Sequence, residues 1–178
     1  MSASEVFIFV PKPHPATLGD EELLAQCTVG KGRSGGPGGQ NRNKVETLVM
    51  IAHDATGTES HAGERRSSIE NKAVAVRRLR LSLAVRVRTP VPSGEVRSAL
   101  WVSRCKGGRI VCSVEHRDFA SLVAEAMDVI VAAGYDVRKA ALRLCCSSSQ
   151  LVKLLQGHPP AMGAVNAGRA EAGMHALK

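Results

Sequence analysis

The sequence is poor in aromatic residues, which make up only 3% of its 178 residues. Proteins that bind single-stranded nucleic acid in general stack the bases on aromatic rings, so this device is excluded as the main mode of binding. Long hydrophobic runs are also missing: the longest one near the start, residues 6–10, ends at Pro11. A membrane-spanning helix needs about 18 apolar residues. Glu5 and the acidic residues 20–22 are unlike a signal or transit peptide. We therefore expect a cytoplasmic protein with no membrane partner.

Paired cysteine motifs are absent as well. The five cysteines are an odd number, and none of them forms a C-x-x-C pair, which fits reduced cytosolic thiols better than a disulfide framework. Cys105, Cys112 and His116 could supply zinc ligands, but their spacing matches no common zinc finger. Small, buried apolar side chains are the simpler interpretation of these cysteines. We expect neither a metal nor another cofactor.

Positive charge is in excess, with 24 Lys and Arg residues against 16 Asp and Glu residues and a net charge of +8. A charge of this sign favours an anionic partner, with nucleic acid as the first candidate. The excess is local, because Glu70 is the only acidic residue between Arg65 and Arg88. Taken alone, this basic segment is equally consistent with a solvated helix face.

The first half of the chain predicts a small sheet followed by a helix. Residues 45–53 are strand-like, residues 54–57 form a turn, and residues 58–62 can return as the partner strand. Residues 30–43 are rich in glycine, so we expect no regular element there. A short helical turn is expected at residues 20–27. The main helix should begin at Ser67 or Ser68, run to about Arg86 and bury the apolar positions Ile69, Ala73, Val76, Leu79 and Leu83.

The second half of the chain predicts helices alone. Residues 89–94 are rich in proline and turn residues and form the clearest boundary. The fold class is therefore α+β: a small mixed or antiparallel sheet with a packed basic helix, followed by an all-helical C-terminal module. The expected domains are an irregular N-terminal arm at 1–26, a catalytic domain at 27–90 and the helical module at 91–178.

Within the helical module, five helices are expected. Residues 95–105 and the segment after Asp118 are helical candidates, and a final helix should follow Pro159 and Pro160. Residues 137–154 suggest two short helices around a turn, with Cys145 where a helix-turn-helix usually has glycine. An ordinary packed helical hairpin and a nucleic-acid-binding helix-turn-helix both fit this segment. In the second case, the contacts would come from Ser148, Ser149, Gln150 and Lys153.

The most informative motif lies in the glycine-rich loop, Arg33-Ser34-Gly35-Gly36-Pro37-Gly38-Gly39-Gln40-Asn41-Arg42-Asn43-Lys44. It is not a P-loop, because no Gly-Lys-Ser/Thr follows at the required spacing. His53-x-x-Thr56-Gly57 and Arg66-Ser67-x-x-x-Asn71-Lys72 follow it along the chain. This order resembles the catalytic domain of class I peptide chain release factors and their codon-independent ribosome-rescue relatives, which carry R-S-x-G-x-G-G-Q-x-x-N-K, H-x-x-T-G and R-S-x-x-x-N-K in register. The resemblance covers about residues 27–88.

The resemblance implies hydrolysis of the peptidyl-tRNA ester in the ribosomal peptidyl-transferase centre. It assigns catalysis to Gly38, Gly39 and Gln40, with the backbone N–H of Gln40 as a donor to the oxyanion or a guide for water. The implied partners are large-subunit ribosomal RNA, peptidyl-tRNA and a glutamine methyltransferase that acts on Gln40. The residues expected to contact RNA, through phosphates in the main, are Arg33, Asn41, Arg42, Asn43, Lys44, Arg66, Lys72, Arg77 and Arg78.

Two features depart from the family pattern. Asn41 stands where the family commonly has histidine, and the last twenty residues contain only Arg169 and Lys178 as bases, unlike the basic tail of compact rescue factors. The chain also leaves no room for a codon-reading domain. We therefore expect a codon-independent release or rescue hydrolase. Two alternatives are a non-catalytic RNA-binding factor that keeps the scaffold and a DNA-binding regulator that uses residues 137–154.

Overall fold

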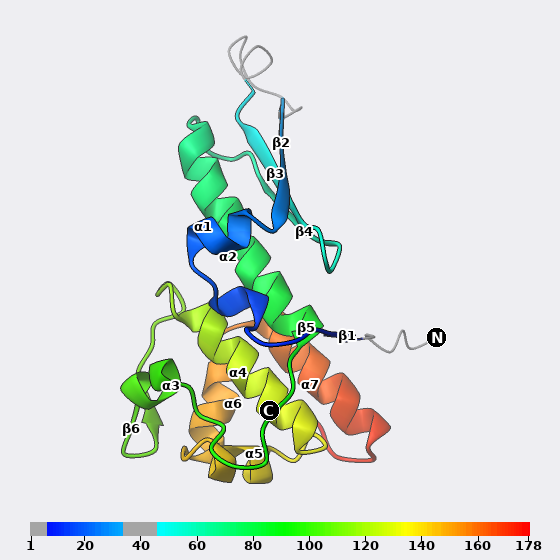
Figure 1. The fold of residues 1–178 in the computed structure, drawn as a ribbon. Helices are drawn as coiled ribbons and strands as arrows, with labels where there is room; N and C mark the ends of the chain where they lie inside the picture. The colour runs from blue at the N-terminus through cyan, green and yellow to red at the C-terminus, as the bar shows by residue number, and fades with distance from the viewer. Residues whose placement is uncertain (1–6, 34–45) are drawn as a thin grey trace. The chain divides into compact units, whose positions relative to one another are not determined.

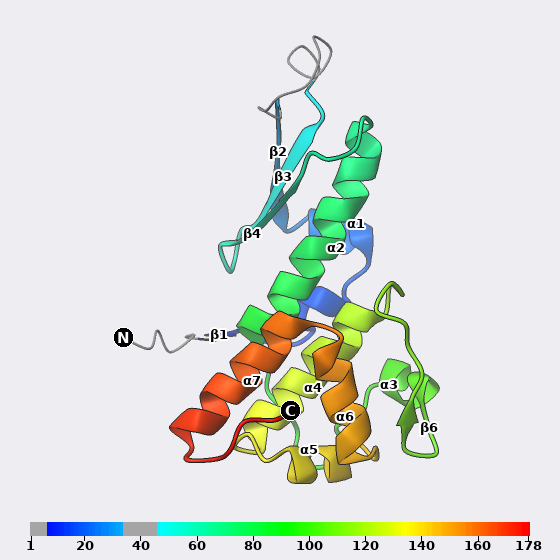
Figure 2. The same ribbon diagram turned by 180° about the vertical axis from the view of Figure 1, so that it is seen from behind.

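The computed structural model of the chain describes residues 7–33 and 46–178. The chain divides into two compact units, Leu18–Leu83 and Met1–Thr17 with Ala84–Lys178. The expected α+β class is confirmed, while the three expected domains stay a prediction. Figures 1 and 2 show the elements within each unit. In chain order they are β1 (Ile8–Phe9), η1 (Pro15–Thr17), α1 (Asp20–Leu24), β2 (Cys27–Gly32), β3 (Leu48–His53), β4 (Thr58–Ala62), α2 (Ser68–Arg86), β5 (Val87–Arg88), α3 (Ala99–Arg104), β6 (Cys105–Lys106), β7 (Arg109–Ile110), α4 (Phe119–Ala132), α5 (Val137–Arg143), α6 (Ser148–Gln156) and α7 (Pro159–Glu171).

The unit at 18–83 contains a three-stranded antiparallel sheet in the order β2-β3-β4. The expected hairpin of β3 and β4 is confirmed. The expectation that residues 30–43 hold no regular element is wrong for residues 30–32, which belong to β2. Cross-strand pairing outweighs the low strand preference of glycine here, because Gly30 lies opposite Met50 and Gly32 opposite Leu48. Both glycines leave space beside those larger side chains.

The long basic helix α2 begins at Ser68, as expected, and the hydroxyl of Ser67 accepts a bond of 3.4 Å from the Glu70 N–H. Its expected buried positions are only partly correct. Ile69 is 80% exposed and Ala73 is exposed, whereas the polar Asn71 is fully buried. Ile69 and Ala73 face solvent, whereas the amide of Asn71 binds three backbone groups. The buried side chains in the rest of the helix are Ala75, Val76, Leu79, Leu83, Ala84 and Val85.

The unit formed around residues 84–178 packs on α4, a helix that is buried on most of its surface. Figures 1 and 2 show α4 beside α6 and α7, with α3 and the β6–β7 hairpin next to α6. The helical character of this region is confirmed, but the two-residue strands β6 and β7 mean that it is not helical throughout. Among the described residues, no helix combines the length and the hydropathy needed to cross a membrane.

Three helix ends in this unit differ from expectation. The helix expected at 95–105 begins only at Ala99, because Ser98 caps it by accepting a 3.0 Å bond from the Trp101 N–H. Asp118 precedes α4 as expected, yet its carboxylate forms no cap and binds Arg104 instead, because a guanidinium is the stronger partner. The last helix begins at Pro159 itself, because the first helical position needs no N–H donor.

The N-terminal segment is not an irregular arm where the structure describes it. β1 pairs in parallel with β5, and Ser121 on α4 donates a 3.2 Å hydrogen bond to the carbonyl of Ala16. The imidazole of His14, which is 6% exposed, lies with Nε2 3.0 Å from the Val87 carbonyl and Nδ1 3.1 Å from the Ala16 N–H. A carbonyl can only accept and an N–H can only donate, so the proton sits on Nε2 and the ring is neutral. Residues 7–17 are thus an integral part of this unit.

A buried ion pair lies where α2 ends. Arg88 is 1% exposed, and its Nη1 lies 3.0 Å from Oδ1 of Asp128 on α4. The guanidinium also donates to the carbonyls of Ala84 and Val85, the last turn of α2, while its Nε has no hydrogen-bond partner among the described residues. Thr89 donates its N–H and its hydroxyl to the same carboxylate. Each buried charge is therefore compensated by the other and by hydrogen bonds.

Removing one partner of this pair should be costly. In Asp128→Ala, the Arg88 guanidinium stays buried without its counter-charge, so we expect the free energy of unfolding to fall by about 3–5 kcal/mol. Denaturant unfolding followed by the fluorescence of Trp101, the only tryptophan and a fully buried one in the same unit, measures this change. Asp136→Ala removes an exposed carboxylate that caps α5 and should cost only about 1 kcal/mol. Equal losses in the two variants would contradict this role of the ion pair.

His14 should make the same unit sensitive to acid. Burial, opposed by the hydrogen bond to Val87 and supported by the charge of Arg88, lowers the pKa of His14 from 6.5 to about 4. Between these two pH values the unfolded chain binds a proton that the folded chain does not, so stability decreases as the pH falls. The slope from this group reaches about 1.4 kcal/mol per pH unit. Denaturant unfolding followed by Trp101 fluorescence at pH 7 and at pH 5 measures this change. Between these two pH values, His14→Gln should lose less of its free energy of unfolding than the unchanged protein.

Candidate functional site

The predicted catalytic motif occupies the connection between β2 and β3. Gly32, at the end of β2, is paired with Leu48, at the start of β3. The predicted catalytic residues Gly38, Gly39 and Gln40 lie outside the described residues, as do the predicted RNA contacts at residues 41–44. The described residues thus hold the two ends of this connection side by side, in a fixed antiparallel register.

Arg33 and Glu46 are the described residues nearest to the motif. Arg33 Nε lies 4.0 Å from Glu46 Oε1, and both side chains are more than half exposed. An exposed ion pair of this length contributes little to stability, because solvent screens it. The positive charge of Arg33 is therefore available to an anionic partner at little cost.

The H-x-x-T-G motif forms the turn between β3 and β4. The N–H of Gly57 donates 2.8 Å to the carbonyl of His53, and Gly57 adopts a φ of +60°, which a residue with a Cβ rarely tolerates. His53 Nδ1 lies 2.8 Å from Thr56 Oγ1, and that oxygen donates 3.0 Å to Thr58 Oγ1. The motif therefore builds a tight turn and ties it to the buried face of the sheet.

His53 is a structural residue rather than an RNA contact. It is 1% exposed, and its Nε2 lies 3.3 Å from Oε1 of Gln26 just before β2. Burial lowers the pKa of His53 below its ordinary value, and the nearby carboxylate of Asp54 opposes that shift only in part. The ring is thus uncharged at neutral pH and does not attract phosphate. Asp54 accepts the N–H and the hydroxyl of Thr28, which fixes the turn against the first residues of β2.

Asn71 connects the β3 side of the motif loop and the segment after β4 to α2. Its Nδ2 donates 2.6 Å to the carbonyl of Thr47, which precedes β3, and 3.0 Å to the carbonyl of Arg65. Its Oδ1 accepts 2.9 Å from the Arg65 N–H. Sequence reasoning included this residue in a motif but gave it no role. The signal is an asparagine four positions before the buried Ala75, on the same face of the helix.

The five predicted RNA contacts that the structure describes lie on the surface of this unit. Arg66, Lys72, Arg77 and Arg78 are exposed, and the last three project from α2. Arg78 is also held in place, because Glu64 binds it at 2.6 Å and the His61 carbonyl accepts from it at 2.9 Å. Backbone N–H groups of residues 64 and 63, together with Arg78, lower the pKa of Glu64. The RNA-binding role of all five stays a prediction.

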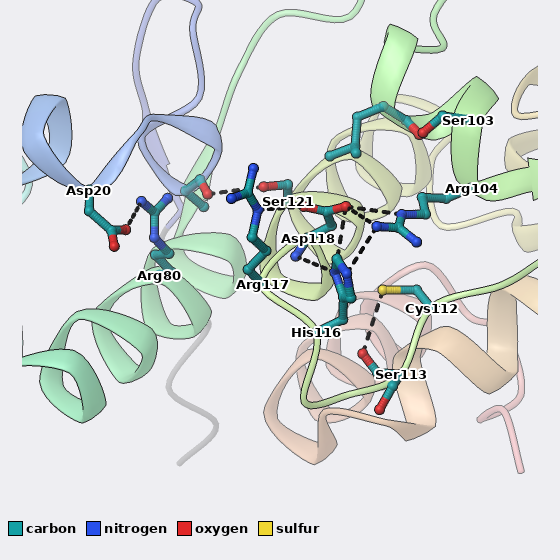
Figure 3. Close-up of polar contacts among 12 residues, drawn as sticks. Asp20, Arg80, Ser103, Arg104, Cys112, Ser113, His116, Arg117, Asp118 and Ser121 are labelled. Carbon is teal, nitrogen blue, oxygen red and sulfur yellow. Dashed lines mark hydrogen bonds and ion pairs between the residues drawn. The ribbon is translucent and has the colours of Figure 1, made fainter. Parts of the chain in front are cut away.

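Figure 3 shows two further ion pairs, one in each unit. Arg80 on α2 binds Asp20 on α1 at 2.6 Å, and its side chain is only 12% exposed. In the other unit, Arg104 donates to Asp118 at 2.7 and 2.9 Å and lies 3.0 Å from Nε2 of His116. The first ion pair connects α1 to α2, and the second connects α3 to the start of α4.

The residues considered for zinc do not come together. Cys112 donates toward the carbonyl of Ser113, Cys105 toward that of Cys145, and His116 contacts Arg104 and Asp118. Burial raises the pKa of both Cys105 and Cys112, which keeps these thiols protonated. No group of three or more His, Cys, Asp or Glu residues in the described part of the chain is placed to hold a metal ion.

Comparison with known proteins gives matches for the region that contains the glycine-rich motif. Residues 24–97 match the family described as the RF-1 domain. A chloroplastic peptide chain release factor of Arabidopsis thaliana is 51% identical over 53 residues, which are 30% of this chain and 12% of the relative. Peptide chain release factor 1 of Chlorobaculum tepidum is 49% identical over 51 residues, 29% of this chain and 14% of the relative.

A third relative matches over a longer part of the chain. An uncharacterized, mitochondrial peptide chain release factor-like protein of Saccharomyces cerevisiae is 35% identical over 101 residues, 56% of this chain and 64% of the relative. The chain thus spans less than two thirds of the length of each of these relatives. No solved structure matches. Together, the comparisons support a release-factor-like role.

The different positions of Asn71 and Lys72 generate a testable contrast. Asn71→Ala leaves the carbonyl of Thr47 and both backbone groups of Arg65 without partners, so we expect a loss of about 2–4 kcal/mol in the stability of this unit. Lys72→Ala changes an exposed side chain and should alter stability by no more than about 0.5 kcal/mol. Hydrogen exchange of the β3 amides measures both. Comparable destabilisation by the two substitutions would show that Asn71 does not have the role described.

Proposed function

We propose, on the premise that residues 24–97 are an RF-1 domain of the class I release-factor type, that the chain hydrolyses the ester of peptidyl-tRNA on stalled ribosomes. The release would be independent of a codon. The active loop would be Gly38, Gly39 and Gln40 in the peptidyl-transferase centre. The expected partners are large-subunit RNA, peptidyl-tRNA and a glutamine methyltransferase for Gln40.

One observation carries this proposal: the register that pairs Gly32 with Leu48. It makes the segment with the R-S-x-G-x-G-G-Q-x-x-N-K pattern the connection between two hydrogen-bonded strand ends. Asn71 ties Thr47, on the β3 side of that connection, to the start of the basic helix α2. The paired strand ends and the bond of Asn71 therefore fix where this connection leaves and re-enters the sheet, in the unit that carries the exposed basic residues.

The chemistry needs few side chains. When water attacks the ester carbonyl, a proton leaves the water, negative charge develops on the carbonyl oxygen, and the ribose hydroxyl departs with a proton. A backbone N–H placed at the developing oxyanion lowers the barrier, and one such donor contributes about 3–4 kcal/mol in well-studied cases. The N–H of Gln40 is the proposed donor, while its side chain shapes a pocket that admits water. Gly38 and Gly39 leave space for the surrounding RNA because they carry no Cβ.

The exposed basic residues would orient the loop. Arg66, Lys72 and Arg77 are exposed, and in this proposal they would contact ribosomal RNA, in the main through phosphates. Such contacts position the protein without reading sequence, and they weaken as the salt concentration rises. The action of the loop would then depend on docking of the whole domain, which confines hydrolysis to the ribosome. The expected compartment is the cytoplasm, whereas two of the relatives carry chloroplastic and mitochondrial names.

The first test is the release of labelled peptide from purified ribosomes that carry peptidyl-tRNA. Two templates are compared, a truncated messenger and one with a stop codon in the vacant site. We expect release on the truncated messenger and a decrease of at least about 100-fold in Gly39→Ala, because a Cβ at this position displaces the oxyanion donor. Gln40→Ala keeps the backbone N–H, so it should decrease release to a smaller extent, through the loss of the side chain that shapes the water pocket. Release that depends on the stop codon would contradict codon independence.

Gly94→Ala is the matched control. Gly94 has open space around the position of a Cβ and no positive φ, so alanine fits there. Its release rate should equal that of the unchanged protein. Release that survives in Gly39→Ala and Gln40→Ala would refute the catalytic proposal, and ribosome binding without release on either template would identify a non-catalytic factor.

A further inference from the structure

The segment α5–α6 has the backbone of a helix-turn-helix. Cys145, at the position where such turns usually have glycine, adopts a φ of +50°. Ala141 is 2% exposed where the two helices cross, and Leu144 and Leu151 are fully buried between them. Ser147 then caps α6 by accepting 3.2 Å from the Gln150 N–H. The second helix is thus set at a defined angle to the first, as in proteins that lay one helix against a nucleic acid.

A β-hairpin is attached to the start of α6. The carbonyl of Gly108 accepts 3.1 Å from the Ser147 N–H, and the Ile110 N–H donates 3.2 Å to Oε1 of Gln150. Gly107 and Gly108 both have positive φ, which allows the tight turn between β6 and β7. Figure 2 shows β6 and α6 next to each other in this unit. The hairpin and α6 therefore present a joint surface.

This joint surface carries charge of one sign. Residues 105–110 and 137–156 contain no aspartate or glutamate. Asp136 caps α5 and lies 3.9 Å from Lys139, and Glu95 is paired with Arg97 at 2.6 Å. No ion pair joins Lys106, Arg109 or Lys153 to an acidic residue within the described part of the chain. The basic residues of the surface, all exposed except for the half-buried Arg143, are Lys106, Arg109, Arg138, Lys139, Arg143 and Lys153.

The arrangement favours phosphate contacts over base reading. Gln150, the residue suited to a bidentate contact with a base, is turned toward the hairpin and accepts from Ile110. The hydroxyl of Ser147 is used by the helix cap. The exposed positions of α6 are Ser149, Lys153 and Gln156, which recur at helical spacing and include only one charge. Such a face binds a backbone regardless of its sequence.

We infer that α5, α6 and the β6–β7 hairpin form a second RNA-binding surface, which contacts the phosphates of a double-stranded RNA segment. The choice of RNA over DNA rests on the proposed function, since a protein that acts on ribosomes meets RNA helices. A backbone-directed surface suits such helices because side chains cannot read the deep, narrow major groove of A-form RNA. The surface would give the release factor a ribosomal contact that is separate from its catalytic loop.

The test measures binding of the full-length chain to a fluorescent RNA duplex of about 20 base pairs by anisotropy. The variant is Lys106→Gln/Arg109→Gln/Lys153→Gln, and a DNA duplex of the same sequence is measured in parallel. Loss of three phosphate contacts should raise the Kd at least about tenfold at 0.1 M salt and reduce the slope of log K against log salt by about 3. Trp101 fluorescence confirms that the variant is folded.

The matched control is Lys12→Gln/Arg86→Gln/Arg117→Gln, which removes the same charge from exposed positions outside the joint surface. Its Kd should change less than about threefold. An equal loss in both triple variants, or no loss in the first, would overturn the inference. Tighter binding to DNA than to RNA would overturn the choice of RNA and favour the DNA-binding alternative.

The outcome is separable from that of the proposed function. The duplex assay contains no ribosome, and release in Gly39→Ala does not depend on the joint surface. An RNA affinity that falls in the triple variant, combined with release that survives in Gly39→Ala, would support the surface and refute the catalytic proposal. An RNA affinity that is unchanged in the triple variant, combined with release that is lost in Gly39→Ala, would support the catalytic proposal and refute the RNA-binding surface.

Discussion

The unit around residues 84–178 depends on the buried ion pair between Arg88 and Asp128. Arg88 closes the last turn of α2, Asp128 belongs to the buried helix α4, and β5 pairs with the N-terminal β1 at the same place. The ring of Phe7 lies 5.2 Å from the guanidinium carbon, so residues near the start of the chain also cover this charge. A buried pair tolerates little change, because either charge alone is expensive to keep out of water. One contact thus joins three parts of the chain that are distant in sequence: the segment around β1, the junction of α2 and β5, and α4.

A different constraint organises the unit at 18–83. The antiparallel register holds the ends of the motif-bearing connection together, and the turn at His53–Gly57 and the amide of Asn71 hold the strands and the helix in that register. His53, Thr56 and Asn71 are buried, and they hold the strands and the helix in place. Among the described motif residues, Arg33, Arg66 and Lys72 are exposed basic residues suited to an external partner. The motifs therefore contain buried residues that stabilise the fold and exposed basic residues that are available to a partner.

Prediction from the sequence succeeded where the pattern is local. The β3–β4 hairpin, the start and end of α2, and the two helices around Cys145 follow from turn residues, caps and helical spacing. It was wrong for Ile69 and Ala73, for Gly30 to Gly32 and for residues 7–17. For the glycines and for residues 7–17 the deciding partner is distant: Met50 and Leu48 for the glycines, and Val87 for His14.

The sequence by itself determined the family resemblance, the α+β class and the excess of positive charge, because each depends only on which residues follow one another. Tertiary structure alone decided that Asn71 is buried and that Gln150 faces the β6–β7 hairpin. The physical reason is that hydrogen bonds of buried polar groups must be completed by whatever the fold brings near. The spacing of residues along the chain does not indicate which groups will complete these hydrogen bonds.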